Sequence, residues 1–284
     1  LFVSNLLLFI QQNSDKFILG RTIGPRSLGH YNIASELATL PTTVLIAPIN
    51  RAAFPAYSKL ASDNGALNRQ FLSIYGQIAM LAFPATLAIA VCSAQIVQVL
   101  LGPNWLEAIP LLQLFVVSGL TSALQGNLFS VILAMGHPRA NTLMTAGTLV
   151  VYLPAIAWAS LQHGAVGAAW VHLVMSIVIL IPLHAVFFKL TGLEATRYVS
   201  RLWRPALASS VMGGVMYLTL ATPWMASLPR VVALLGTCLV GGLVFCTVVY
   251  LSWRMAGRPI DSAEAAILDR LRAVAVRNVR RTRS

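Results

Sequence analysis

Long apolar runs alternate with short polar segments along the whole chain. A helix needs about 20 mostly apolar residues to cross the hydrocarbon core of a membrane. Eight runs are long enough, and each predicts one membrane-spanning helix: residues 1–20, 28–52, 71–100, 109–135, 141–160, 165–188, 205–222 and 228–253. The third run is long enough to break, and we expect the break near Ser93. The pattern predicts an all-α protein, a polytopic bundle of about eight transmembrane helices.

The composition supports a membrane protein. Of the 284 residues, 57% are hydrophobic and 10% are charged, whereas soluble domains carry about 25% charged residues. A soluble chain of this length would need more polar surface.

The basic residues are unevenly divided between the two sets of loops. With eight spans, one side of the membrane receives residues 51–70, 136–140, 189–204 and 254–284, which hold sixteen of the 20 Lys and Arg residues. The other side receives only Arg21, Arg26 and Arg230. Because Lys and Arg collect on the cytoplasmic side, we expect the first set of loops and the C-terminus to be cytoplasmic. The net charge of +12 therefore needs no nucleic-acid partner.

Enzyme motifs are missing from the sequence. It contains no Walker motif, no G-x-S-x-G, no H-E-x-x-H and no G-x-G-x-x-G. The three cysteines lie inside apolar runs at spacings that match neither a zinc site nor a disulfide framework. We therefore expect no enzyme activity, no bound metal and no cofactor.

Prolines and glycine pairs occur within several of the apolar runs. Proline removes a helix hydrogen bond and can bend the helix, and adjacent small residues let helices approach closely. Gly213–Gly214 and Gly241–Gly242 are expected to bring the last two helices together. The prolines expected to interrupt spans are Pro41, Pro48, Pro84, Pro154 and Pro182.

Polar residues at membrane depth are the candidates for function, because charge there is costly and usually faces a bundle interior or a water-filled cavity. The first span contains Gln12, Asp15 and Lys16, and the second contains Glu36. Three interpretations remain open. Lys16 could pair with Glu36 or Asp15 for packing, a cationic patch around Lys16 could bind an anionic headgroup, or Asp15 or Glu36 could bind a proton or sodium ion.

Four further residues have two interpretations each. Arg51 and Arg139 lie near cytoplasmic helix ends, where each either snorkels to the headgroups or binds a pyrophosphate. Gln125 and Asn127 in the fourth span either form interhelical hydrogen bonds or line a substrate cavity.

An ordered series of short motifs resembles the second half of Wzx-type polysaccharide flippases, in the multidrug/oligosaccharidyl-lipid/polysaccharide exporter superfamily. It covers about residues 1–190. The segments are 15–21 (DKFILGR), 28–31 (LGHY), 40–41 (LP), 48–58 (PINRAAFPAYS), 101–105 (LGPNW), 110–114 (PLLQL), 134–138 (AMGHP) and 164–169 (GAVGAA).

The resemblance implies two helical bundles that surround a central cavity and work by alternating access. It implies transport of undecaprenyl-pyrophosphate-linked oligosaccharide across the bacterial inner membrane, from the cytoplasmic to the periplasmic leaflet, for O-antigen, capsule or exopolysaccharide. Implied partners are this lipid-linked oligosaccharide, membrane lipids, and the polysaccharide polymerase and export machinery.

The resemblance also implies a division of the chain. Residues 1–190 would form the C-terminal bundle of six helices, residues 191–253 two additional helices, and residues 254–284 a basic cytoplasmic tail. The first bundle would precede this sequence, which begins inside an apolar run without Met.

Two other functions remain open. A drug/cation antiporter of the same superfamily should favour carboxylates in its cavity, and the acidic residues in spans here are Asp15 and Glu36. A non-transporting scaffold of a polysaccharide assembly complex would keep the helices but should tolerate neutralisation of Lys16, Glu36 and Arg51.

Overall fold

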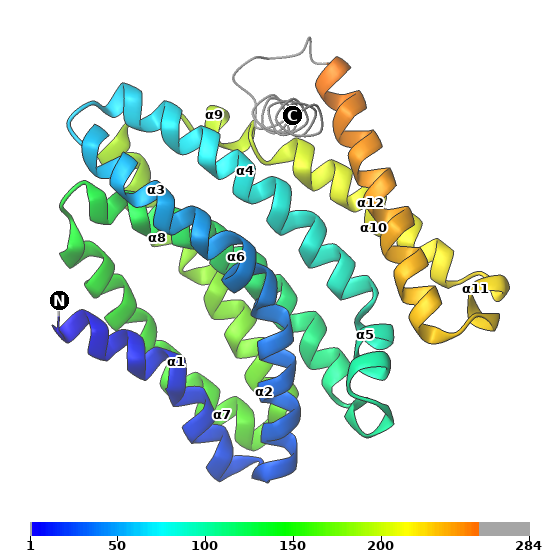
Figure 1. Cartoon of the computed structure of the whole chain (residues 1–284). Helices are drawn as coiled ribbons and strands as arrows, with labels where there is room; N and C mark the ends of the chain where they lie inside the picture. The colour runs from blue at the N-terminus through cyan, green and yellow to red at the C-terminus, as the bar shows by residue number, and fades with distance from the viewer. Residues whose placement is uncertain (1, 256–284) are drawn as a thin grey trace, which may run out of the picture.

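A computed structural model describes residues 2–255 and shows a bundle of long helices (Figure 1). The predicted basic tail, apart from its first two residues, lies outside the described residues. The elements are α1 (Phe2–Thr22), α2 (Gly24–Leu40), η1 (Pro41–Ile46), α3 (Ala47–Leu60), α4 (Asn64–Val91), α5 (Ser93–Leu100), η2 (Pro103–Trp105), α6 (Ala108–Ala134), α7 (Pro138–Val178), α8 (Leu180–Thr191), α9 (Ala195–Val199), α10 (Trp203–Leu220), α11 (Pro223–Ser227) and α12 (Arg230–Met255).

The eight predicted spans correspond to eight helical passes, which confirms the fold class. The break in the third pass falls at Cys92, next to the expected Ser93. The fifth and sixth passes are the two legs of α7, which meet at a kink at Gly164 (φ 61°, ψ −147°). Such a backbone conformation is essentially restricted to glycine. The sixth pass continues into α8 across a break at Ile179, where Pro182 lacks the N–H that would bond to Val178.

Within residues 2–255, four helical runs are long and apolar enough to cross a membrane by length and composition: Asn64–Val91, Ala108–Ala134, Pro138–Thr191 and Arg230–Met255. The third run contains both passes that meet at Gly164. Large apolar side chains on these helices point outward, and Val150, Ile181, Leu239 and Leu243 are each 70% or more exposed. Exposure of such an apolar surface is unfavourable in water and favourable against the acyl chains of a bilayer.

The core lies around α6, which contacts α2, α3, α4, α7 and α8. One cluster of buried side chains joins α3, α4, α6 and α8 around Tyr57, Phe71 and Phe187. A second joins α1, α2, α6 and α7 around Tyr31, Leu112 and Ile156. These two clusters hold together the helices that carry the candidate residues.

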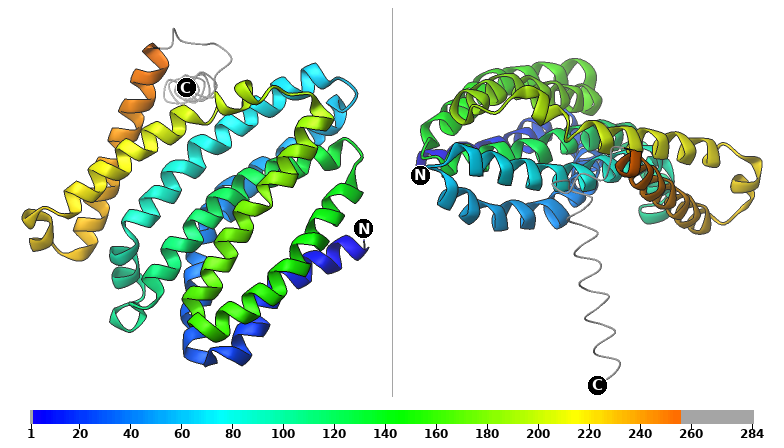
Figure 2. Two further views of the ribbon diagram at one scale, coloured as in Figure 1. Left: turned by 180° about the vertical axis from the view of Figure 1, so that it is seen from behind. Right: turned by 90° about the horizontal axis from the view of Figure 1, so that it is seen from above.

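The last two long helices, α10 and α12, pack against each other and against α4 and α5, and they extend from one side of the bundle (Figure 2). At Gly241 an added Cβ would lie 2.5 Å from Met216 Sδ of α10, so this glycine permits the predicted contact. Gly213 instead faces α4, because its added Cβ would lie 2.7 Å from Leu87 Cδ2. The expectation that both glycine pairs join α10 to α12 is therefore wrong for Gly213.

The connections gather at two opposite ends of the helices, as the alternation of spans predicts (Figure 1). One end holds the α3–α4 and α6–α7 turns and α9. There the hydroxyls of Tyr75 and Tyr198 form a hydrogen bond, and His184 Nε2 lies 2.6 Å from Tyr198 Oη. Burial raises the pKa of the Tyr198 hydroxyl to about 12, so this group stays protonated. These contacts fix α9 to α4 and α8.

Candidate functional site

Asp15 and Lys16 are neighbours on α1 but have different surroundings. The Asp15 carboxylate is 8% exposed, and it accepts hydrogen bonds from the Lys16 backbone N–H (2.8 Å) and from Tyr31 Oη (3.4 Å). The Lys16 side chain is exposed. Consecutive residues of a helix point about 100° apart, which separates the two side chains.

Asp15 belongs to a polar group inside the core between α1, α2 and α7. Tyr31 is fully buried, Tyr152 is 5% exposed, and Tyr152 Oη lies 3.3 Å from His172 Nδ1. The ring of Phe115 from α6 packs edge-on against both Tyr31 and His172. The carboxylate of Asp15, the phenols of Tyr31 and Tyr152 and the imidazole of His172 together form a group that can bind and transfer a proton. The tyrosines were not singled out in the sequence, since no local signal marks which helix faces α1.

Lys16, Glu36 and Arg51 do not form ion pairs with one another. The ion pairs within residues 2–255 join Glu107 to Arg26 and His30, and Glu194 to Arg197. Lys16 and Glu36 are both exposed, and the Lys16–Glu36 pair considered from the sequence is not formed. The three charged side chains are thus available at the surface of this chain.

Glu36 and Arg51 belong to one exposed stripe along α2, η1 and α3. Exposed residues recur there at three- and four-residue spacing, while Tyr31, Ala38, Ile46 and Tyr57 face inward. We call this stripe the α2–α3 face. Its polar members are Glu36, Thr39, Thr43, Arg51, Ser58 and Lys59, and apolar residues such as Leu40 and Val44 lie among them.

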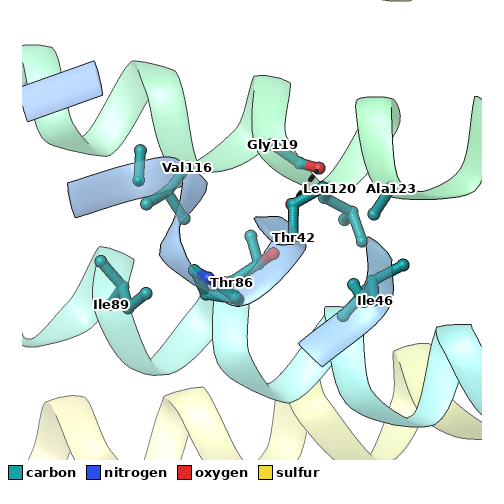
Figure 3. Close-up of a pocket in the computed structure, with 11 residues that line it drawn as sticks. Thr42, Ile46, Thr86, Ile89, Val116, Gly119, Leu120 and Ala123 are labelled. Atoms are coloured by element: carbon teal, nitrogen blue, oxygen red, sulfur yellow. Dashed lines mark hydrogen bonds between the residues drawn. The ribbon is translucent and has the colours of Figure 1, made fainter. Parts of the chain in front are cut away.

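The exposed stripe stays on one side of the helix from α2 to α3 because η1 between them is one turn of π-helix. The Ala47 N–H bonds to Thr42 O, five residues back, next to Pro41, which has no N–H to donate. The Thr42 hydroxyl donates to Gly119 O of α6 at 3.3 Å (Figure 3). The hollow beneath this turn is about 10 Å³, which is room for about one water. It cannot admit a sugar or a lipid.

Asn127 and Gln125 lie inside the bundle. Asn127 is fully buried and donates to Asn50 Oδ1 (3.0 Å), and its amide also forms a hydrogen bond with Tyr57 Oη. Gln125 is 8% exposed and donates to Ser176 O at 2.6 Å. These bonds join α6 to α3 and to α7. The side chain of Gln12, the remaining candidate on α1, is not among those described.

Replacing Asn127 by leucine is expected to destabilise the protein by about 2–3 kcal/mol, because Asn50 and Tyr57 would lose their buried partner. Unfolding of the detergent-purified protein measures this change. The matched control Tyr57→Phe removes only one hydroxyl and should cost about 1 kcal/mol. Normal stability of Asn127→Leu together with lost activity would instead assign Asn127 to a substrate cavity.

Comparison with known proteins shows similarity to polysaccharide biosynthesis proteins. Residues 1–110 match the family described as "Polysaccharide biosynthesis protein". The chain is 26% identical over 215 residues to the teichuronic acid biosynthesis protein TuaB of Bacillus subtilis (strain 168), covering 75% of this chain and 44% of that protein. It is 27% identical over 206 residues to the lipopolysaccharide biosynthesis protein WzxC of Escherichia coli (strain K12), covering 72% of this chain and 42% of that protein.

The fold is also that of a solved transporter. The lipid II flippase MurJ, in its inward closed conformation, superimposes with a TM-score of 0.76 and 15% sequence identity, over 90% of this chain and 53% of MurJ. This chain therefore spans less than half the length of TuaB and WzxC and resembles about half of MurJ. The resemblance to Wzx-type exporters is confirmed: this chain is related to membrane proteins of polysaccharide biosynthesis and has the fold of one half of a two-bundle transporter.

Proposed function

We propose that this chain forms one half of a flippase that moves a lipid-linked, pyrophosphate-bearing oligosaccharide across the bacterial inner membrane. The observation that carries the proposal is the α2–α3 face, which exposes Glu36, Thr39, Thr43 and Arg51 along the second of the eight helical passes. Charged groups at this depth are costly against lipid and favour a water-filled cavity. A second bundle that packs opposite this face would enclose such a cavity.

Exposed cations on α1 and on the α2–α3 face suit the substrate. A pyrophosphate binds ammonium and guanidinium groups, and Lys16 and Arg51 would supply one of each. Both side chains are exposed, so they can reach a ligand without a change in the core. In this proposal Gln12 is a further candidate to contact the substrate, and the buried Gln125 and Asn127 would fix the helices behind the cavity wall.

The energy would come from an ion or from the substrate gradient, since the chain has no P-loop. Asp15, with Tyr31 and His172 in its surroundings, is the better placed coupling residue. Glu36, which is exposed, is the alternative. The buried carboxylate also favours the second candidate, an ion-coupled drug antiporter of the same superfamily.

The orientation of the chain in the membrane would follow from the basic loops. The α3–α4 and α6–α7 turns and the segment around α9 would face the cytoplasm, together with the C-terminus. Residues 1–190 would form the half-transporter, and residues 191–253 two additional helices beside it. The polymerase and export machinery would receive the flipped substrate in the periplasm.

Complementation of a strain that lacks its own flippase tests the proposal, with the complete gene product that contains this chain. Two readouts are needed, the surface polysaccharide and the pool of lipid-linked intermediate. Restored polysaccharide with a drained pool is the expected result. Good membrane insertion without restoration in strains that make several glycans would favour the antiporter. Restoration that persists in neutral variants of Lys16, Glu36 and Arg51 would instead favour a scaffold.

A further inference from the structure

A second and larger hollow lies at the end of the bundle that carries the α6–α7 turn. It has a volume of about 650 Å³, within the range of about 300–1,000 Å³ that is typical of ligand sites. It is formed by the α6–α7 turn, the first turn of α7 and the last turn of α8. The lining residues are Gly136, His137, Pro138, Arg139, Ala140, Val186, Lys189 and Leu190.

The hollow carries positive charge from two elements. Arg139 comes from α7 and Lys189 from α8, and both side chains are exposed. No carboxylate is among the lining residues, and neither cation takes part in the ion pairs found within residues 2–255. An anion could therefore bind to both cations without displacing an acidic side chain.

Apart from His137 and Gly136 of the turn, the rest of the wall is apolar and lies at the border of the membrane. Pro138, Ala140, Val186 and Leu190 line it. α6 ends at Ala134, α7 begins at Pro138 and α8 ends at Thr191, so the hollow lies level with the ends of three membrane-spanning helices. An apolar wall with two cations at headgroup level complements a molecule with an anionic phosphate and an apolar body. Basic pockets between transmembrane helices bind anionic lipid headgroups in this way.

We propose that this hollow binds the headgroup of an anionic bilayer phospholipid, with its phosphate between Arg139 and Lys189. The glycerol and the first acyl carbons would lie against Val186 and Leu190. The bound lipid would join the start of α7 to the end of α8, outside the α2–α3 face. Neither Lys16 nor Arg51 lines this hollow.

Native mass spectrometry of the full-length protein tests this site, with phosphatidylglycerol and phosphatidylcholine as probes. Wild type should retain phosphatidylglycerol preferentially. The double variant Arg139→Gln/Lys189→Gln should bind phosphatidylglycerol about 30-fold more weakly, since each surface cation contributes about a factor of five. Val186→Phe keeps both cations but narrows the hollow, so it should also lose binding of phosphatidylglycerol. Thermal unfolding checks that this variant is folded.

The control variant Arg69→Gln/Arg254→Gln removes the same charge from exposed residues outside the hollow, and it should bind like wild type. Equal binding by the Arg139/Lys189 variant, or an equal loss in the control, would overturn the proposal. Displacement of phosphatidylglycerol by inorganic phosphate would overturn it in favour of a free-anion site. Displacement by an equal concentration of undecaprenyl pyrophosphate would assign the hollow to the transported substrate. Because the readout is phospholipid binding, its failure leaves the complementation result unaffected.

Discussion

Replacing Gly167 by leucine is expected to prevent the protein from folding stably. The kink at Gly164 turns the chain back, so that Gly167 lies against the first leg of α7. A Cβ at this position would lie 2.6 Å from both Ala159 O and His163 Cβ. The oxygen belongs to the backbone and cannot move aside as a flexible side chain could. We expect a loss of more than about 3 kcal/mol of stability, measured as purified yield and thermal unfolding in detergent.

Gly147 provides the matched control within the same helix. Nothing lies within 4 Å of a Cβ added there, so Gly147→Leu should insert and unfold like wild type. If Gly167→Leu were as stable as Gly147→Leu, the two legs of α7 would not pack as described.

Lys16→Glu is expected to reduce transport by about 10-fold or more relative to Lys16→Arg. A 10-fold reduction corresponds to a loss of about 1.4 kcal/mol in the free energy of substrate binding. The exposed ammonium of Lys16 would contact the pyrophosphate, and arginine preserves the charge while glutamate repels the ligand. The measurement is the rate at which the lipid-linked intermediate is drained in the complemented strain. The protein level must be compared in parallel.

Arg230→Glu is the control for this charge reversal, because Arg230 begins α12 and lies outside both α1 and the α2–α3 face. Acidic residues contribute little to membrane orientation, so this variant should insert and transport normally. Equal activity of Lys16→Glu and Lys16→Arg would count against a substrate-binding role and would support a packing role for Lys16.

Much of the architecture was predictable from residue patterns. Apolar runs mark the passes because an unsatisfied backbone polar group is costly in lipid, so each run must form a helix. The loop at residues 101–107 ends one pass, and the break near Ser93 was expected from the length of its run alone. These features depend on local composition, which a sequence shows directly.

The contacts of the candidate residues were not predictable in the same way. Asp15 is buried beside Tyr31 because α1 presents that face to α2 and α7, and Lys16, one position later, points to the surface. Similar depth in the membrane was the only basis for pairing Lys16 with Glu36, and depth does not fix helix rotation. Gly213 likewise meets α4 because the position of α10 depends on the whole bundle.

The single turn of π-helix at Pro41–Ile46 determines how the side chains of α3, which follows it, are rotated about the helix axis. A π-turn holds one residue more than an α-turn, and each residue corresponds to about 100° of rotation. If one residue were lost from this segment and the helix became regular, α3 would rotate by about that angle relative to α2. Arg51 and Lys59 would leave the side of the helix that carries Glu36, and the buried face of α3 would turn away from α6. The extra residue thus keeps the buried side of α3 toward the core and its polar side in line with that of α2, along the whole 37-residue helical run Gly24–Leu60.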